Sequence, residues 1–317
     1  MSTEAILKVS GLRVSFPTGK GRTVQALRGV DFELRRGEVL GLVGESGCGK
    51  STLARAVMQL HRPQAGRVQL LGREITGLSE KALRPLRPEM QMVFQDPYAS
   101  LNPRSNIGSI LTEPQLAHGL IKPEEADERC AELLDMVGLA ASAATKYPHE
   151  FSGGQRQRIA IARALALKPS VLIADEPVSA LDVSIQAQII NLLQDLVAKL
   201  NLSMIFIAHD LSVVKHISDR IAVMYLGRMV ELGEATRVIE QPSHPYTRAL
   251  VASIPKPDPE HQPLAAAPLA GDPPSPLAPP KGCAFHERCP RVVARCSQEM
   301  PELLPLDDRQ ACACFNP

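Results

Sequence analysis

The sequence predicts an α/β fold with a mixed, mainly parallel sheet and antiparallel edge strands, an all-helical subdomain and a short cysteine-rich C-terminal module. Three observations support this prediction. Short continuous apolar runs, typical of strands covered on both faces, occur at Val39–Val43, Val171–Ala174 and Met204–Ala208. Apolar residues take helical spacing between positions 103 and 166. Five of the seven cysteines fall within the last 35 residues.

The remaining segments set the expected boundaries. Ile6–Ser15 and Gly29–Leu34 alternate between apolar and polar residues, which indicates exposed antiparallel strands. From Pro242 onward lie 16 of the 27 prolines, so residues 255–281 are expected to form an extended linker. We therefore expect a core from residues 1–102 and 167–240, a helical subdomain from 103–166, an extension with its linker from 241–281 and a cysteine-rich module from 282–317.

Composition limits the classes of function. The chain has 317 residues, of which 44% are hydrophobic, and this is enough to bury a large core. Its net charge of +1 does not favour wholesale binding to nucleic acid or to an anionic membrane surface. No signal-peptide pattern and no apolar run of about 18 residues is present. We expect a cytosolic protein that reaches a membrane only through a partner.

A glycine-rich loop follows the first buried strand. Residues 44–51 match G-x-x-x-x-G-K-S, and a helix is expected over Ser51–Leu60. Glycines allow successive backbone N–H groups to converge on phosphate oxygens, the lysine adds a positive charge and the serine hydroxyl can ligate Mg²⁺. The N-terminus of the helix favours the same anion. The sequence predicts a triphosphate site formed by Gly44, Glu45, Ser46, Gly47, Cys48, Gly49, Lys50, Ser51 and Thr52.

Two carboxylates end the second buried strand. Asp175 is expected near the Mg²⁺ ion and Glu176 beside the terminal phosphate, as a general base for an attacking water. Before this strand, Phe151–Gln155 opens an apolar helix whose first residues, Ser152, Gly153 and Gly154, offer a second set of backbone donors to an anion.

Five motifs then occur in one order: the phosphate loop, Phe151–Gln157, Val171–Glu176, Ser179–Asp182 and His209. Over residues 5–240 the chain resembles the ATP-binding subunits of ABC transporters. The resemblance implies an ABC-type P-loop NTPase core that binds ATP and Mg²⁺. It also implies a dimer in which the signature residues of one subunit, Ser152, Gly153, Gly154 and Gln155, face the γ-phosphate held by the other.

The same resemblance implies roles for single residues. Gln95 would contact the metal and the attacking water, and His209 the γ-phosphate. Asp182 would communicate across the dimer, and Phe16 would stack on adenine. The implied catalytic residues are Lys50, Gln95, Glu176 and His209, and the implied Mg²⁺ ligands are Ser51, Gln95 and Asp175.

The C-terminal part resembles a narrower group. Ser243–Leu250 and residues 274–290 look like the extension of dipeptide and oligopeptide importer ATPases, most closely the F-type subunits of dipeptide systems. Gln95–Arg104 supports this placement. The resemblance implies a second, related ATPase chain in a heterodimer, two integral permease subunits and an extracytoplasmic peptide-binding protein. It places the chain peripherally at the cytoplasmic face of the inner membrane, with no nucleic-acid partner.

Other interpretations stay open. Three alternatives to a peptide-importer ATPase remain. The chain is a soluble ABC ATPase acting on nucleic acid or ribosomes, an importer ATPase for glutathione or nickel, or a metal-dependent sensor that uses its tail. The first is disfavoured because such proteins commonly carry two ATPase units or long coiled coils.

The clustered cysteines predict a metal site. Four thiolates can hold an iron–sulfur cluster or a zinc ion, and the resemblance favours a [4Fe–4S] cluster over Zn²⁺ and over free thiols. Cys312 would compete for the fourth position. Cys48, in the phosphate loop, is expected to fill space, or to be redox-sensitive if its pKa is depressed. The expected ligands of the iron–sulfur cluster or zinc ion are Cys283, Cys289, Cys296 and Cys314.

Overall fold

The computed structural model describes residues 4–19, 21–254 and 271–317. Contacts divide the chain into two compact units. Unit 1 comprises residues 1–4, 35–37 and 78–205, and unit 2 comprises residues 5–34, 38–77 and 206–317. The domain boundaries expected from the sequence stay a prediction. Among the helices in the described part of the chain, none is long and apolar enough to cross a membrane.

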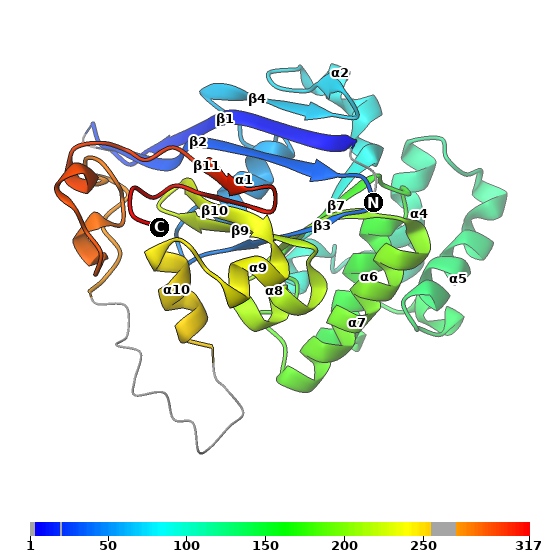
Figure 1. The fold of residues 1–317 in the computed structure, drawn as a ribbon. Helices are drawn as coiled ribbons and strands as arrows, with labels where there is room; N and C mark the ends of the chain where they lie inside the picture. Colours follow the sequence, from blue (N-terminus) through cyan, green and yellow to red (C-terminus); the bar gives the residue numbers. More distant parts are fainter. Residues whose placement is uncertain (1–3, 20, 255–270) are drawn as a thin grey trace, which may run out of the picture. The chain divides into compact units, whose positions relative to one another are not determined.

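Unit 2 contains an antiparallel sheet in the order β2-β1-β4-β5 (Figure 1). It is formed by β1 (Ala5–Pro17), β2 (Thr23–Arg35), β4 (Ala65–Leu70) and β5 (Arg73–Glu74). β1 and β4 pair with Leu7 opposite Leu70. Apolar residues of β1 and β2 point into the core while alternate positions face outward, which is why the period-two pattern identified both strands. Both are longer than the sequence indicated.

The other strands of unit 2 lie in the order β11-β12-β10-β9-β3. β3 (Val39–Val43) and β9 (Arg220–Tyr225) pair in parallel, with Leu42 opposite Ala222. β10 (Arg228–Glu234) and β9 are antiparallel. The helices in the described part of this unit are α1 (Lys50–Val57), α8 (Leu211–Ile217), α9 (Ala235–Glu240) and α10 (Pro245–Ala252).

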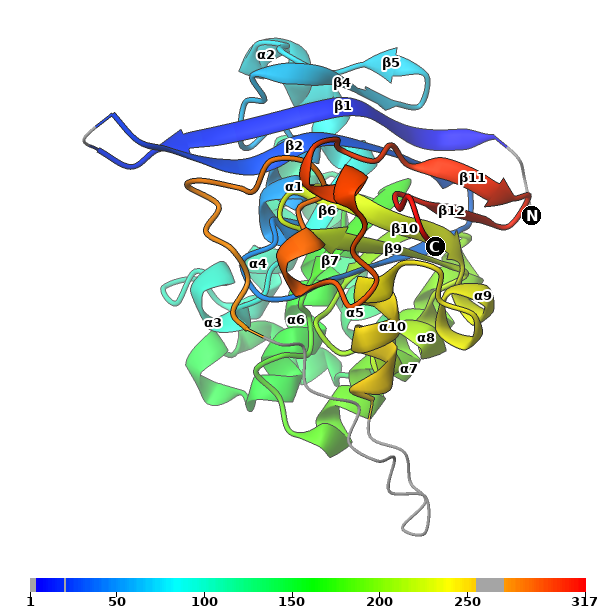
Figure 2. The same ribbon diagram turned by 60° about the vertical axis from the view of Figure 1, so that its left-hand side comes forward.

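The C-terminal segment is part of this sheet, so the expected separate cysteine-rich module is not supported. β12 (Gln310–Cys312) pairs antiparallel with β10 and with β11 (Leu304–Asp307), and Figure 2 shows β12 beside β10. The 3₁₀ turns η5 (His286–Arg288) and η6 (Ala294–Ser297) precede them. Phe285 is 1% exposed and packs 5.3 Å from the ring of Tyr225 on β9. The tail therefore shares its core with the rest of unit 2. The linker predicted over 255–281 lies outside the described residues as far as position 270.

Unit 1 combines parallel strands with helices. β6 (Met90–Val93) and β7 (Val171–Asp175) pair in parallel, and β8 (Ser203–Ile207) begins in this unit and ends in unit 2. The helical prediction for 103–166 is confirmed by α4 (Ile107–Ala117), α5 (Ala126–Met136) and α6 (Gly153–Leu165). The remaining helices are α2 (Glu80–Leu83), α3 (Pro97–Ser100) and α7 (Val183–Leu200), and the 3₁₀ turns are η1 (Arg84–Glu89), η2 (Pro123–Glu125), η3 (Ala141–Thr145) and η4 (Pro148–Glu150).

Candidate functional site

The phosphate loop of unit 2 connects β3 to α1, as the sequence predicted. Lys50 is the first residue of α1 and is 5% exposed. Its Nζ donates hydrogen bonds to the carbonyl oxygens of Gly44 at 2.7 Å and Glu45 at 3.2 Å. The N–H of Cys48 donates to the Glu45 carbonyl at 3.2 Å. The loop is therefore folded around its lysine, with Ser51 and Thr52 in the first turn of the helix.

Two glycines of the loop are required by their surroundings. Gly49 has φ +109°, and a Cβ there would stand 2.5 Å from the carbonyl oxygen of Ala26. A Cβ on Gly44 would stand 2.2 Å from the carbonyl oxygen of Met224. Gly47, at φ +77°, has open space around its Cβ position. The backbone can thus approach its neighbours and a ligand closely only because side chains are absent, which fits a phosphate cradle.

Glu45 is held from the C-terminal part of the chain. Its N–H donates to the Tyr246 hydroxyl at 2.8 Å. Its carboxylate accepts two hydrogen bonds from Arg288, at 2.9 and 3.0 Å. The Arg288 side chain is 5% exposed and that of Glu45 is 25% exposed.

The other nucleotide residues predicted in unit 2 are Phe16 and His209. Phe16, half-buried near the end of β1, packs edge-on against His61 with 5.2 Å between ring centroids. His209 is exposed and follows β8. The N–H of Ala208 donates to the carbonyl of Leu42 at 3.3 Å, so His209 lies at the end of β3 from which the phosphate loop leaves. This position fits a histidine directed at the terminal phosphate.

Unit 1 brings together three of the predicted residues. Asp175 ends β7 and is 2% exposed, and Glu176 follows it in the left-handed region at φ +46°. Gln95 Nε2 donates to Glu176 Oε2 at 2.9 Å. A left-handed backbone is costly for a residue other than glycine, and it persists only where the surrounding structure holds it. Here the turn that follows holds Glu176, since the Ser179 hydroxyl donates to the Glu176 carbonyl at 3.1 Å.

The signature residues begin α6. The Ser152 hydroxyl accepts from the Gln155 N–H at 3.4 Å, and the Gln155 side chain accepts from the Ser152 N–H at 3.0 Å, which completes a capping box. A Cβ on Gly154 would stand 2.5 Å from Ile185 of α7. Gly154 is thus needed for helix packing as well as for exposing backbone, a role that the sequence did not reveal. Ser152 itself is exposed.

Asp182 caps α7 in the same unit. Its carboxylate accepts from the Ile185 N–H at 3.0 Å and from the Ser184 hydroxyl at 2.7 Å. These hydrogen bonds, that of Ile185 first, lower the pKa of Asp182. The side chain is exposed, and the lowered pKa keeps it charged at neutral pH.

Comparison with known proteins decides the family. A family model described as ABC transporter matches residues 27–179, and one described as oligopeptide/dipeptide transporter, C-terminal region, matches residues 230–296. A probable peptide ABC transporter ATP-binding protein, y4tS of Sinorhizobium fredii, is 52% identical and covers 98% of this chain and 90% of its own length. The chain belongs to the ABC transporter family, as one of its ATP-binding proteins.

Further relatives of this ABC ATPase agree. The di/tripeptide transport ATP-binding protein DppF of Pseudomonas aeruginosa is 52% identical over 92% of this chain and 90% of its own. The oligopeptide transport ATP-binding protein OppF of Escherichia coli is 50% identical over 95% and 93%. Among solved structures, the ATP-binding cassette MJ0796, a dimer in a post-hydrolysis state bound to ADP and Pi, superimposes with a TM-score of 0.66 at 29% identity, over 72% of this chain and 98% of its own.

The cysteines do not form the expected metal site among the described residues. Within residues 4–19, 21–254 and 271–317, no group of three or more His, Cys, Asp or Glu side chains is placed to hold a metal ion. Burial raises the pKa of Cys283 to about 11 against a lowering backbone hydrogen bond at Phe285, and the neighbouring Cys296, Cys314 and Cys289 add to the rise. Burial also raises the pKa of Cys289 and Cys314. The placement of these side chains therefore does not support the iron–sulfur or zinc prediction.

Cys48 fills space, as expected. It is 4% exposed, and burial raises its pKa despite the opposing charge of Lys50. The alternative of a redox-sensitive thiol with a depressed pKa is wrong, because desolvation outweighs the nearby ammonium group.

Sequence reasoning missed the residues that join the tail to the ABC ATPase core. Glu231 on β10 is fully buried and accepts from the N–H groups of Ser243 and His244 at 2.8 and 2.9 Å, and from the Gln310 side chain. His244 in turn caps α10, accepting from the Tyr246 N–H at 3.1 Å. The segment Ser243–Tyr246 was visible as a family-like motif, but its partners were distant in sequence.

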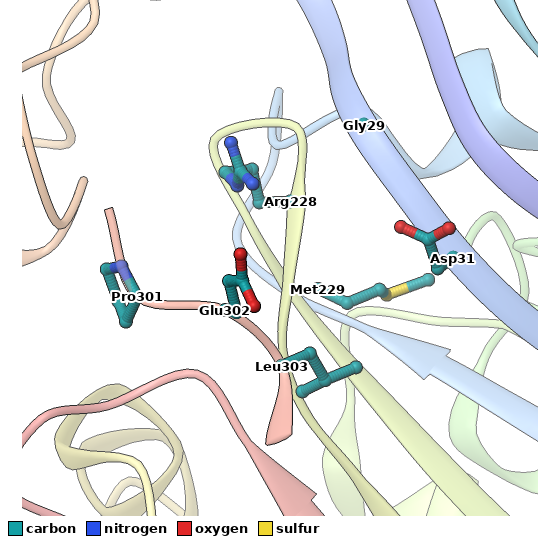
Figure 3. A pocket seen from close by; sticks show the side chains of 7 residues that line it. All are labelled: Gly29, Asp31, Arg228, Met229, Pro301, Glu302 and Leu303. Carbon is teal, nitrogen blue, oxygen red and sulfur yellow. The ribbon is translucent and has the colours of Figure 1, made fainter. Parts of the chain in front are cut away.

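A cavity of about 350 Å³ lies elsewhere in unit 2 (Figure 3). Its wall combines Asp31 on β2, Arg228 on β10 and Glu302 in the tail, so it carries charges of both signs. None of the predicted nucleotide residues lines it.

Proposed function

We propose that this ABC ATPase powers the uptake of di- and oligopeptides through a membrane importer. The observation that carries the proposal is the match of the C-terminal region at residues 230–296 to that of oligopeptide and dipeptide transporters. Relatives named for peptide transport, about half identical over nearly the whole chain, support the same substrate class.

The proposed chemistry gives a role to each of the predicted catalytic residues and Mg²⁺ ligands. ATP supplies the phosphoryl group whose transfer to water releases the free energy for transport, and Mg²⁺ neutralises charge on its terminal oxygens. Lys50 and His209 would stabilise the phosphoryl charge, and Ser51, Gln95 and Asp175 would hold the metal. Glu176 accepts a proton from the attacking water, and the hydrogen bond from Gln95 orients its carboxylate. Phe16 offers its ring to the adenine.

The proposed assembly completes the site with a second ATPase chain. Ser152, Gly153, Gly154 and Gln155 of one chain would meet the nucleotide of the other, and Asp182 would lie at the contact between them. Two permease subunits and an extracytoplasmic peptide-binding protein complete the importer, with this chain at the cytoplasmic face of the membrane. We propose a related second chain rather than an identical one. The mass of a co-purified complex tests this choice.

Reconstitution tests the function. In liposomes with the permease subunits and the peptide-binding protein, a labelled dipeptide should accumulate only with ATP, and Lys50→Ala should abolish both hydrolysis and uptake. Lys199→Ala, an exposed lysine on α7, is the matched control and should transport like the parent. ATP turnover by Lys50→Ala at the parent rate would refute the nucleotide site. ATPase activity without peptide uptake would contradict the peptide substrate. Stimulation of that activity by glutathione or nickel would then favour an importer of that solute, and stimulation by nucleic acid or ribosomes would favour a soluble ATPase.

A metal on the tail stays a prediction from the sequence. Anaerobic purification followed by iron and zinc analysis and a visible spectrum tests it. A colourless, metal-free and folded tail contradicts it.

A further inference from the structure

The phosphate loop is gripped at Glu45 by two residues that lie more than 200 positions later in the chain. From this arrangement we infer that Arg288 and Tyr246 are positioning residues for nucleotide binding, through which the C-terminal tail holds the loop in its binding conformation. The inference rests on the proposed ATPase site, because it assigns partners to that site's own loop.

Hydrogen bonds of the Glu45 backbone connect Tyr246 to Lys50. Tyr246, fully buried in α10, accepts the Glu45 N–H at 2.8 Å. The carbonyl of the same residue accepts from Lys50 Nζ at 3.2 Å and from the Cys48 N–H at 3.2 Å. A displaced Glu45 would therefore remove one of the two carbonyl groups that orient the lysine ammonium group. Tyr246 contacts neither the lysine nor the phosphates in this scheme, so it acts only by holding the loop.

Charge gives Arg288 a second effect. Its guanidinium forms a two-point pair with the Glu45 carboxylate and also donates to the Tyr225 hydroxyl at 3.2 Å. The hydrogen bond to Glu45 raises the pKa of Arg288. The guanidinium carbon lies 5.9 Å from the ring centres of both Tyr225 and Phe285. Without this partner, Glu45 would present an uncompensated negative charge beside the site that must receive a triphosphate.

The tail also covers one side of the loop. A cavity of about 190 Å³ is bounded by the loop residues Glu45–Cys48, by Tyr225 and Leu226, and by the proline segment Pro273–Pro276. The N–H of Gln25 donates to the Pro276 carbonyl at 3.2 Å, which fixes that segment to β2. Contacts from α10, from η5 and from the proline segment thus converge on one short loop.

Variants of the full-length chain in the assembled transporter test the inference. Arg288→Ala should raise the Kd for ATP, measured with a fluorescent analogue, about 10-fold, which is ~1.4 kcal/mol. Because the lost interaction serves bound substrate and transition state equally, KM should rise while kcat stays within about twofold. The Kd of Arg288→Lys for ATP should lie between those of the parent and Arg288→Ala. Tyr246→Phe, which keeps the ring but loses the acceptor, should raise KM in the same direction.

Two controls separate positioning from general damage. Arg295→Ala removes an exposed pair with Glu299 inside the tail and should leave the Kd unchanged. Arg288→Ala/Glu45→Gln removes the uncompensated charge but does not restore the pair that holds the loop, so it should recover only part of the affinity. The inference is overturned if Arg288→Ala binds ATP like the parent, or if the double variant binds ATP like the parent, because the effect of Arg288 would then be one of charge alone. If Arg288→Ala fails to fold, Arg288→Lys and Tyr246→Phe decide. A failure here leaves the Lys50→Ala test of the ATPase site intact.

Discussion

Gln95 Nε2 donates a 2.9 Å hydrogen bond to Glu176 Oε2, although the two residues are 81 positions apart in the chain. Both stand at the carboxyl ends of neighbouring parallel strands, β6 and β7, where side chains from separate segments meet. The pair joins the proposed water-activating carboxylate to the residue expected to contact the metal.

Glu176→Gln should lower ATP hydrolysis by a factor of about 10²–10⁴, the usual contribution of a general base, while ATP binding persists. The amide is close in size to the carboxylate but cannot accept the proton of water. Single-turnover hydrolysis and ATP binding are the measurements, and gel filtration with ATP should show a trapped dimer. Glu132→Gln, an exposed carboxylate on α5, is the control. Hydrolysis by Glu176→Gln at the parent rate would exclude Glu176 as the base.

Gly154→Ala should destabilise unit 1 by about 1–3 kcal/mol, because the new methyl group would stand 2.5 Å from Ile185 and force α6 and α7 apart. Urea unfolding measures the loss. Gly153→Ala meets Leu181 only at 3.4 Å and should cost less. The double variant Gly154→Ala/Ile185→Ala restores space at that contact. Equal stabilities for the two single variants would argue against the packing role of Gly154.

Gly49→Ala should abolish binding of ATP, whereas Gly47→Ala should weaken it only moderately. Both require a left-handed backbone, which costs a residue with a Cβ about 1–2 kcal/mol. Only Gly49 adds a collision, at 2.5 Å from the carbonyl of Ala26. Titration with a fluorescent ATP analogue compares them. If Gly47→Ala were the more damaging, the space around the loop would have been assigned wrongly.

Acid should loosen the junction between the tail and the sheet through His244. Burial lowers the pKa of His244 from about 6.5 to about 3, and the charge of Arg248 acts in the same direction. The unfolded chain therefore binds a proton near pH 6.5 and the folded chain only near pH 3. The stability contributed by neutral His244 is complete above pH 6.5 and declines as the pH falls, by about 2 kcal/mol at pH 5.

Urea unfolding at pH 7.5 and pH 5.0 measures this loss. His244→Asn keeps an acceptor for the Tyr246 N–H but cannot be protonated, so the drop between the two pH values should be smaller by about 2 kcal/mol. Identical drops in the parent and the variant would show that His244 does not control the acid sensitivity.

The sequence by itself indicated five of the strands, the helical region between residues 103 and 166 and the motifs, because each depends on local spacing. Val39–Val43 had to be a buried strand, and glycines followed by Lys50 had to form a phosphate loop. Family resemblance then gave roles to residues such as Gln95 and His209, which carry no local signal. The cysteines illustrate the limit of this reasoning, since their clustering suggested metal ligands, but among the described residues no group of side chains is placed to hold a metal ion.

Only the tertiary structure decided where the tail lies and what it holds. Arg288 and Glu45 are 243 positions apart, and no local sequence pattern around either residue predicts that they pair. The pairing of β12 with β10 and the packing of Phe285 on Tyr225 bring them together. Local periodicity predicts which face of a segment is buried. The partner of a buried charge such as that of Arg288 depends on the long-range packing of the whole unit.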